Sequence, residues 1–172
     1  MKTLTDHLTM YAEYHRDRRN IATHFVGIPL IVLAITTLLS LPALGVTLDN
    51  GLRLTAATAV AVLSCLFYLR LSAGFGLTMT AVMAGLLWAG DAIAQTLPGQ
   101  AAAIGIALFV VGWVFQFIGH YYEQRKPAFV DDLVGLLVGP LFLVAEVAFA
   151  LGLATRERDE VLRRAGPTLI RS

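Results

Sequence analysis

The stretch AIAQTLPGQAAAIGIALFVVGWVFQFIG, Ala92 to Gly119, contains no Asp, Glu, Lys or Arg. Leu97-Pro98-Gly99-Gln100 reads as a turn, and the residues on either side of it are mostly apolar. A helix needs about 20 such residues to cross the roughly 30 Å hydrocarbon core of a bilayer. The apolar residues that follow the turn reach about this length, so they predict a helix that crosses a membrane.

Other parts of the chain repeat this pattern. Four further stretches are nearly free of charge: Phe25–Leu52, Leu54–Leu69, Leu71–Gly90 and Leu133–Thr155. The chain is 57% hydrophobic and 15% charged, whereas soluble domains are about 25% charged. A soluble fold of 172 residues could not bury so much apolar surface. We therefore expect an all-α, polytopic membrane protein, in which the short Leu54–Leu69 span is extended by snorkelling of Arg53 and Arg70.

The last apolar stretch is expected to be broken. Basic residues cluster before the first span and after the last, at Arg16, Arg18, Arg19, Arg156, Arg158, Arg163 and Arg164. Five full crossings would put these clusters on opposite sides, although positive segments favour the cytoplasm. Gly139-Pro140 lies mid-stretch and permits two half-helices that enter and return, and Asp131 and Asp132 are expected to open this segment. The prediction is a bundle of four full spans plus a broken or re-entrant fifth segment.

We expect one integral-membrane domain over residues 1–172, with an interfacial helix at 3–19, a membrane bundle at 24–155 and a cytoplasmic tail at 156–172. Asn20 is expected to cap the helix that leads into the first span. The polar first two dozen residues do not resemble a cleaved signal peptide. A formal charge of +1 gives no indication of nucleic acid. The short loops suit a bacterial inner membrane, and the oligomeric state is left open.

The four histidines are the first candidate site. In the topology above, His7, His15, His24 and His120 all lie near the cytoplasmic interface. One interpretation is that they are anchors in the lipid headgroup layer; the other is that they bind a metal. His7 and His15 share one helix face, but His15 and His24 are nine residues apart and half a turn out of phase. They can share an ion only if the chain bends around Arg16–Asn20.

Charged residues near the histidines extend this candidate. Glu123 follows His120 at i+3, and histidines with a carboxylate suit non-haem Fe(II). Arg125 and the neighbouring lysine are either anchors at the membrane surface or a grip for a substrate carboxylate. Glu146 is a functional candidate because a carboxylate in an apolar run is costly, whereas Asp91 reads as interfacial. Glycine-rich nucleotide loops in a strand–helix context and G-x-S-x-G elbows are absent from the sequence.

Two motifs carry a resemblance to a known family. HRDRRNIATHFVGIP, His15 to Pro29, and QFIGHYYEQRKPA, Gln116 to Ala128, resemble the yeast-type 2-hydroxy fatty acid dioxygenases. These are polytopic membrane enzymes of alpha-oxidation in phytosphingosine breakdown, with bacterial relatives. Relatives often carry Asn-Pro where this chain has Asp17-Arg18. The resemblance implies an Fe(II)-dependent reaction with O₂ that shortens a 2-hydroxy fatty acid by one carbon, without 2-oxoglutarate, NADPH or flavin.

The resemblance also implies roles for individual residues. The implied metal ligands are His15, His24 and His120. His7 lies outside the motif, and its place on the helix face that carries His15 makes it an optional fourth ligand. Glu123 would be a ligand or would orient His120, Asn20 would position a ligand, and Arg125 would hold the acid. One metal or two, and the preferred chain length, stay open. The alternatives are a non-enzymatic lipid-binding scaffold or small transporter, and a zinc-dependent membrane hydrolase.

Overall fold

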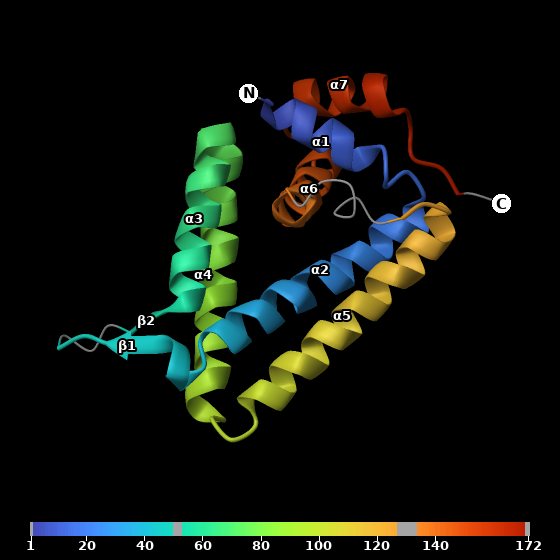
Figure 1. Ribbon diagram of the computed structural model, residues 1–172. Helices are drawn as coiled ribbons and strands as arrows, with labels where there is room; N and C mark the ends of the chain where they lie inside the picture. Colours follow the sequence, from blue (N-terminus) through green and yellow to red (C-terminus); the bar gives the residue numbers. More distant parts are fainter. Residues whose placement is uncertain (1, 50–52, 127–133, 171–172) are drawn as a thin grey trace. The chain divides into compact units, whose positions relative to one another are not determined.

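The computed structural model of the protein describes residues 2–49, 53–126 and 134–170, and in these ranges it is almost entirely helical (Figure 1). The elements in chain order are α1 (Leu4–Ala12), α2 (Arg18–Leu39), the short 3₁₀ turn η1 (Pro42–Leu44), β1 (Gly45–Thr47), β2 (Arg53–Thr55), α3 (Ala56–Leu71), α4 (Ala73–Thr96), α5 (Ala101–Glu123), α6 (Gly135–Ala150) and α7 (Thr155–Ala165). The predicted helix-opening residues Asp131 and Asp132 lie outside the described ranges. The expectation of an all-α fold is confirmed, apart from one two-stranded hairpin.

Three of these helices, α2, α4 and α5, are long and apolar enough to cross a membrane by length and composition. Helix α3 is apolar but has only 16 residues. Helices α6 and α7 form a pair bent by 112°. The predicted turn at Leu97–Gln100 is confirmed, because α4 ends at Thr96 and α5 begins at Ala101. The structure thus contains three long apolar helices plus a bent pair, and the number of full spans stays a prediction.

The break in the last segment lies later than predicted. Helix α6 continues through Pro140, although proline lacks the N–H that would donate to the carbonyl four residues before it. The helix ends instead at Ala150, and Gly152 two residues later has a φ of +74°, the left-handed conformation that glycine adopts at low cost. Gly152 N donates to Phe149 O and Leu153 N donates to Ala148 O, which is the Schellman ending of a helix. The prediction of a break at Gly139-Pro140 is therefore wrong, although the segment is broken.

The N-terminal helix is shorter than predicted. A capping box starts α1, in which Asp6 N donates to Thr3 Oγ1 at 3.2 Å and Thr3 N donates to Asp6 Oδ2 at 2.8 Å. The helix ends at Ala12 rather than at residue 19, because the chain turns to begin α2. Asp17, and not Asn20 as predicted, caps α2 by accepting a hydrogen bond from Arg19 N at 2.8 Å.

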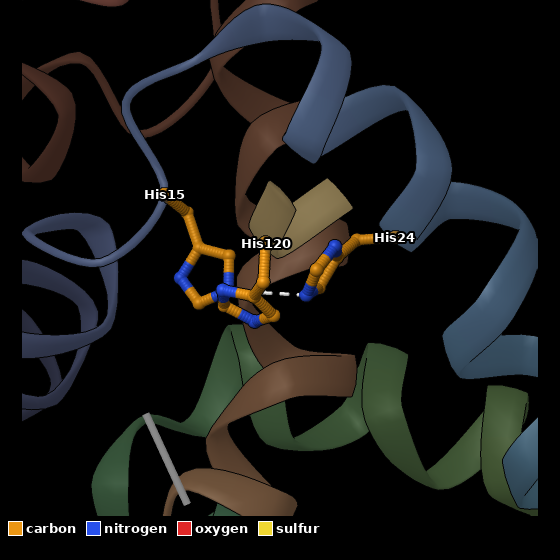
Figure 2. A group of neighbouring side chains, drawn as sticks. All are labelled: His15, His24 and His120. Atoms are coloured by element: carbon orange, nitrogen blue, oxygen red, sulfur yellow. Dashed lines mark hydrogen bonds between the residues drawn. The ribbon is translucent and has the colours of Figure 1, made fainter. Parts of the chain in front are cut away.

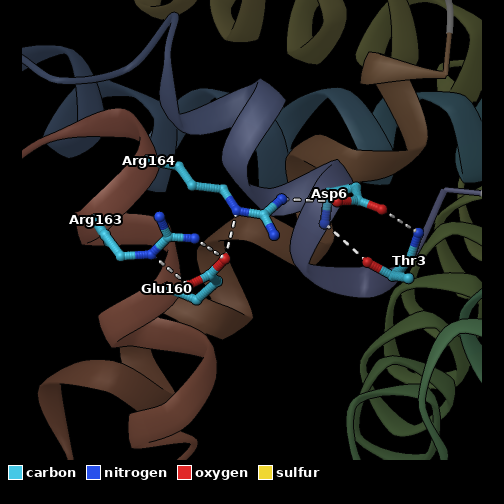
Figure 3. Close-up of polar contacts among 5 residues, drawn as sticks. All are labelled: Thr3, Asp6, Glu160, Arg163 and Arg164. Atoms are coloured by element: carbon cyan, nitrogen blue, oxygen red, sulfur yellow. Dashed lines mark hydrogen bonds and ion pairs between the residues drawn. The ribbon is translucent and has the colours of Figure 1, made fainter.

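The chain forms two compact units. One consists of Met1–Ile28 with Val114–Ser172, and the other of Pro29–Trp113. In the first unit, α1 packs against α6 and α7. Figure 3 shows the polar part of the α1–α7 contact. Arg164 Nε donates to Glu160 of the same helix, and Arg164 Nη1 donates to Asp6 Oδ1 of α1 at 2.8 Å. The predicted single domain, with its interfacial helix, bundle and tail, stays a prediction.

The second unit is built on the hairpin of α3 and α4. A β-carbon at Gly76 would collide with the backbone of Leu69, so glycine is what lets the two helices approach closely at their junction. The strands β1 and β2 pair antiparallel, with Val46 opposite Leu54. Arg53 of β2 connects this pair of strands to α4 through an ion pair with Asp91 at 2.9 Å. The candidate site described below lies entirely in the first unit.

Candidate metal centre

Three buried histidines meet in the first unit (Figure 2). His15 belongs to the loop between α1 and α2, His24 to the second turn of α2, and His120 to the last turn of α5. Their exposed fractions are 1%, 1% and 6%. One potential ligand atom from each lies within 4.8 Å of the other two, which is a group that could hold a metal ion. The three histidines assigned by resemblance are thus brought together.

The bend between α1 and α2 makes this meeting possible. On one continuous helix His15 and His24 would point in different directions, because they are nine residues apart. Helix α1 ends at Ala12 and α2 begins at Arg18, so the intervening residues redirect the chain. The bend therefore lies slightly before the predicted position around Arg16–Asn20, and it allows the ring of His15 to face that of His24.

The hydrogen bonds of His15 and His24 determine the tautomer of each imidazole ring. Nδ1 of His15 lies 2.7 Å from Tyr11 O, and Nδ1 of His24 lies 2.9 Å from Asn20 O. Because a carbonyl oxygen can only accept, each Nδ1 carries the hydrogen and each neutral ring keeps a lone pair on Nε2. These two Nε2 atoms are 3.1 Å apart. Two lone pairs facing each other at this distance repel, unless a cation lies between them.

The donor set fits a metal ion in three further respects. Two nitrogens bound to one ion at about 2.0–2.1 Å are themselves about 3.0–3.4 Å apart, which matches the separation of His15 and His24. Among the residues that the structure describes, His120 Nδ1 is buried and none donates or accepts a hydrogen bond with it. Backbone carbonyls that orient the rings through Nδ1 are the usual support of metal-binding histidines.

The surroundings keep His15 neutral and fix its ring. Burial, followed by the charges of His24 and His120, holds the pKa of His15 well below its usual value of 6.5. The Tyr11 ring stacks on the His15 ring at 4.1 Å between centroids, with the planes within 3° of parallel. The Phe142 ring of α6 is tilted against both rings, with its centroid 5.0 Å from that of Tyr11 and 5.9 Å from that of His15. The neutral imidazole is the form that binds a metal.

Glu123 holds the loop that carries His15. Its side chain is fully buried, and its Oε2 accepts hydrogen bonds from Arg16 N at 2.9 Å, Asp17 N at 2.8 Å and Asn20 Nδ2 at 3.0 Å. These donors lie at the start of α2, where a carboxylate is favoured by the helix dipole. The three-histidine group does not include Glu123. The arrangement indicates a positioning role, and direct coordination of a metal by Glu123 stays a prediction.

Asn20 and Gly119 join α2 to α5 beside the site. Asn20 is fully buried. Its side-chain amide donates a hydrogen bond to Glu123, and its backbone carbonyl accepts one from His24 Nδ1. A β-carbon at Gly119 would collide with Thr23 Oγ1 and Asn20 Oδ1 and would lie 3.2 Å from His24 Nδ1. Sequence reasoning missed this role of Gly119. Its only signal was a glycine directly before His120 in a helix, where glycine is otherwise unfavourable.

Two other predicted site residues lie apart from the three-histidine group. Arg125 is exposed, donates to Glu13 O at 2.7 Å and lies over the Tyr14 ring at 5.7 Å. His7 is half-buried on α1 and does not belong to the group. Their predicted roles, holding the acid and serving as a fourth ligand, stay predictions.

The two carboxylates singled out in apolar runs have charged neighbours. Glu146 of α6 is half-buried and interacts electrostatically with Arg16. Asp91 of α4 pairs with Arg53, away from the histidines in sequence and in the other unit. These interactions provide structural reasons for both carboxylates.

A C-terminal segment also forms hydrogen bonds with the loop that carries His15. No feature of the sequence indicated this contact. Leu169 N donates to Arg16 O and Arg18 N donates to Leu169 O, both at 2.9 Å. The guanidinium of Arg16 donates to Gly166 O at 2.7 Å. No periodic pattern signals this pairing, because it joins residues about 150 positions apart.

Comparisons with known proteins agree with this picture. The sequence model of the family described as "Mpo1-like: 2-hydroxy-palmitic acid dioxygenase Mpo1-like" matches residues 1–151. A protein of Saccharomyces cerevisiae (strain ATCC 204508 / S288c), named "2-hydroxy-palmitic acid dioxygenase MPO1", is 31% identical over 159 residues, covering 89% of this chain and 84% of its own length. No solved structure matches the chain. On this family match and this identity, the chain belongs to the Mpo1-like family of 2-hydroxy-palmitic acid dioxygenases.

Proposed function

We propose that this protein is an Fe(II)-dependent membrane dioxygenase that shortens 2-hydroxy fatty acids by one carbon. The observation that carries the proposal is the pair of Nε2 atoms of His15 and His24, 3.1 Å apart, with His120 beside them. The substrate class follows from the family and from the name of the yeast relative. The membrane location is supported by three helices that are long and apolar enough to cross a bilayer.

The choice of iron rests on chemistry. Imidazoles suit zinc, copper, iron and nickel. Zinc has no redox chemistry, so it cannot supply a reaction with O₂. When bound, iron would supply the redox centre that allows O₂ to react with an organic substrate. Three imidazoles leave coordination positions open, and the hydroxyl and carboxylate of a 2-hydroxy acid can fill two of them.

The overall reaction balances without any co-substrate. A 2-hydroxy acid R–CHOH–COOH and one O₂ give the shorter acid R–COOH, CO₂ and water. The bond between C1 and C2 breaks, the substrate loses four electrons, and O₂ takes up all four. A reductant such as NADPH or 2-oxoglutarate is therefore not needed, which suits a chain whose sequence lacks a nucleotide-binding motif.

In this proposal the residues of the chain have separate tasks. His15, His24 and His120 hold the ion, while Glu123 and Asn20 hold the loop and helix that present the first two. Arg125 holds the substrate carboxylate from the polar side, where its exposed guanidinium can leave Glu13 O. Whether His7 adds a fourth ligand is tested by the variants below.

The proposed topology places the site near the cytoplasmic face. We propose four full spans, α2 to α5, with the α6–α7 pair as the broken fifth segment and α1 at the interface. The arginine clusters around the start of α2 and after α6 then both lie on the cytoplasmic side, where positive segments are favoured. The chain would be one integral-membrane domain, and a bacterial inner membrane suits its short loops.

Metal content and oxygen dependence test the proposal together. We expect the purified protein to contain iron, and to convert 2-hydroxypalmitate and O₂ to the acid one carbon shorter. His120→Ala should lose the iron while remaining folded, and the matched variant His7→Ala should keep it, because His7 lies outside the group. Turnover without O₂ would instead support a zinc hydrolase. A metal-free protein that still performs its cellular role would support a lipid-binding scaffold or transporter.

A further inference from the structure

A buried amide lies one helical turn before His120. Gln116 of α5 is 6% exposed, whereas the adjacent Phe117 is 58% exposed. Within the described parts of the chain, Gln116 Nε2 has no hydrogen-bond partner. A buried donor without a partner is rare, and leaving one unsatisfied opposes folding. The molecule therefore holds a hydrogen-bond donor in its interior that the described residues do not use.

The helix geometry directs this amide toward the three-histidine site. Residues four apart on a helix lie on the same face, about 5–6 Å apart between β-carbons. Side chains on a helix lean toward its N-terminus, so the ring of His120 leans over the turn that carries Gln116. The same face of α5 meets α2 at Gly119, beside His24. Gln116 thus lies next to the histidines, on the side away from the polar end of α5.

The unused donor is explained if its partner is part of the ligand. We propose that Gln116 Nε2 donates a hydrogen bond to the 2-hydroxyl oxygen of the substrate, and so selects 2-hydroxy acids over plain fatty acids. This inference rests on the proposed function, because it assumes that a 2-hydroxy acid binds at the three histidines. It adds a residue to which the family resemblance gave no role.

The hydroxyl is the better partner for two reasons. A carboxylate is a charged group, and the charged donors of this region, such as Arg125, lie beyond the C-terminal end of α5. The carboxylate of the substrate should therefore point to that end. The C2 hydroxyl is one carbon further along, toward the apolar part of α5, which is where Gln116 lies one turn deeper than His120. A neutral amide in an apolar setting suits a neutral hydroxyl.

This arrangement accounts for specificity rather than for the reaction itself. A site that hydrogen-bonds a substrate hydroxyl rejects the analogue without it, because the buried protein group is then left unpaired. Palmitate would leave Gln116 Nε2 without a partner, whereas 2-hydroxypalmitate would satisfy it. The amide is a specificity-determining residue, and removing it should change substrate preference without changing metal content.

Anaerobic binding measurements test the inference without turnover. The iron-loaded protein in detergent is titrated with 2-hydroxypalmitate and with palmitate, and the ratio of the two dissociation constants gives the preference. We expect wild type to prefer the hydroxy acid. Gln116→Leu should reduce this preference about tenfold, as expected for the loss of one hydrogen bond. Its iron content should equal that of wild type. Gln100→Leu makes the same chemical change at an exposed turn and should leave the preference unaltered.

Each outcome separates the hypotheses. If wild type does not prefer the hydroxy acid, the proposed function fails. If wild type prefers it and Gln116→Leu shows the same preference, only the inference fails. An equal loss of affinity for both acids would place Gln116 on the carboxylate and overturn the hydroxyl assignment. Should Gln116→Leu lose iron or unfold, the near-isosteric Gln116→Met is measured instead and judged by the same criteria.

Discussion

Replacing Glu123 with glutamine removes a charge and keeps the shape of the side chain. Three donors converge on one oxygen of this carboxylate: Arg16 N, Asp17 N and Asn20 Nδ2, at 2.8–3.0 Å. A hydrogen bond to a charged acceptor contributes about 1.5–3 kcal/mol and one to a neutral acceptor about 0.5–1.5 kcal/mol. The difference of about 1 kcal/mol per bond gives about 3 kcal/mol in the free energy of unfolding. Glu123 is fully buried, so solvent does not reduce this value.

Thermal unfolding of the metal-free protein in detergent measures this effect. For a chain of this length, about 3 kcal/mol lowers the melting temperature by about 6–12 °C. Because the loop also presents His15, iron affinity should fall about 10- to 100-fold, as it does when residues that support metal ligands are changed. Glu13→Gln is the matched control, because that carboxylate is exposed and the change should stay within about 0.5 kcal/mol.

The reasoning is refuted if metal-free Glu123→Gln melts at the same temperature as wild type. Loss of iron equal to that of His120→Ala, with an unchanged melting temperature of the metal-free protein, would show that Glu123 coordinates the metal directly. The two measurements therefore distinguish a positioning carboxylate from a ligand.

Two further predictions concern the helix contact and the protonation of the site. Gly119→Ala should push α5 away from Thr23 on α2, destabilise the protein by about 1–3 kcal/mol and lower its iron content, measured by thermal unfolding and metal analysis; an unchanged protein would show that the contact is not tight. The pKa of His15 is held below 6.5, so the unfolded chain binds more protons than the folded one below that pH. The stability of the metal-free protein should therefore fall as pH drops below about 6.5, and less steeply in His15→Leu; equal pH dependence of the two would contradict the neutral state.

Local patterns predicted the helices and their approximate positions. Apolar stretches indicated α2 to α6, and Pro98-Gly99 indicated the turn between α4 and α5. The last break was misplaced because proline is a weaker signal than the glycine at position 152, whose left-handed conformation ends α6. The N-terminal helix was drawn too long because the helical spacing of Leu4 to His15 continues past its true end at Ala12.

The site was predictable in part for a different reason. Histidines are few, and the topology predicted from the sequence puts them near one face, so the meeting of His15, His24 and His120 could be expected. The contacts that hold these histidines in place could not be predicted from the sequence. Glu123 contacts Arg16 across 107 residues, and a contact of that length leaves no trace in the local periodicity. The close approach at Gly119 likewise depends on which face of α5 meets α2.

The long-range hydrogen bonds that hold the His15 loop can form only after their partners have been synthesised. Ribosomes add about 5–20 residues per second, so Glu123 emerges about 5–20 s after Arg16, and Gly166, 150 residues later than Arg16, emerges about 8–30 s after it. Until then the loop lacks the partners that fix its backbone. The nascent chain therefore exposes His15 before Glu123 and Gly166 can fix its loop, and the three histidines can come together only late in biosynthesis.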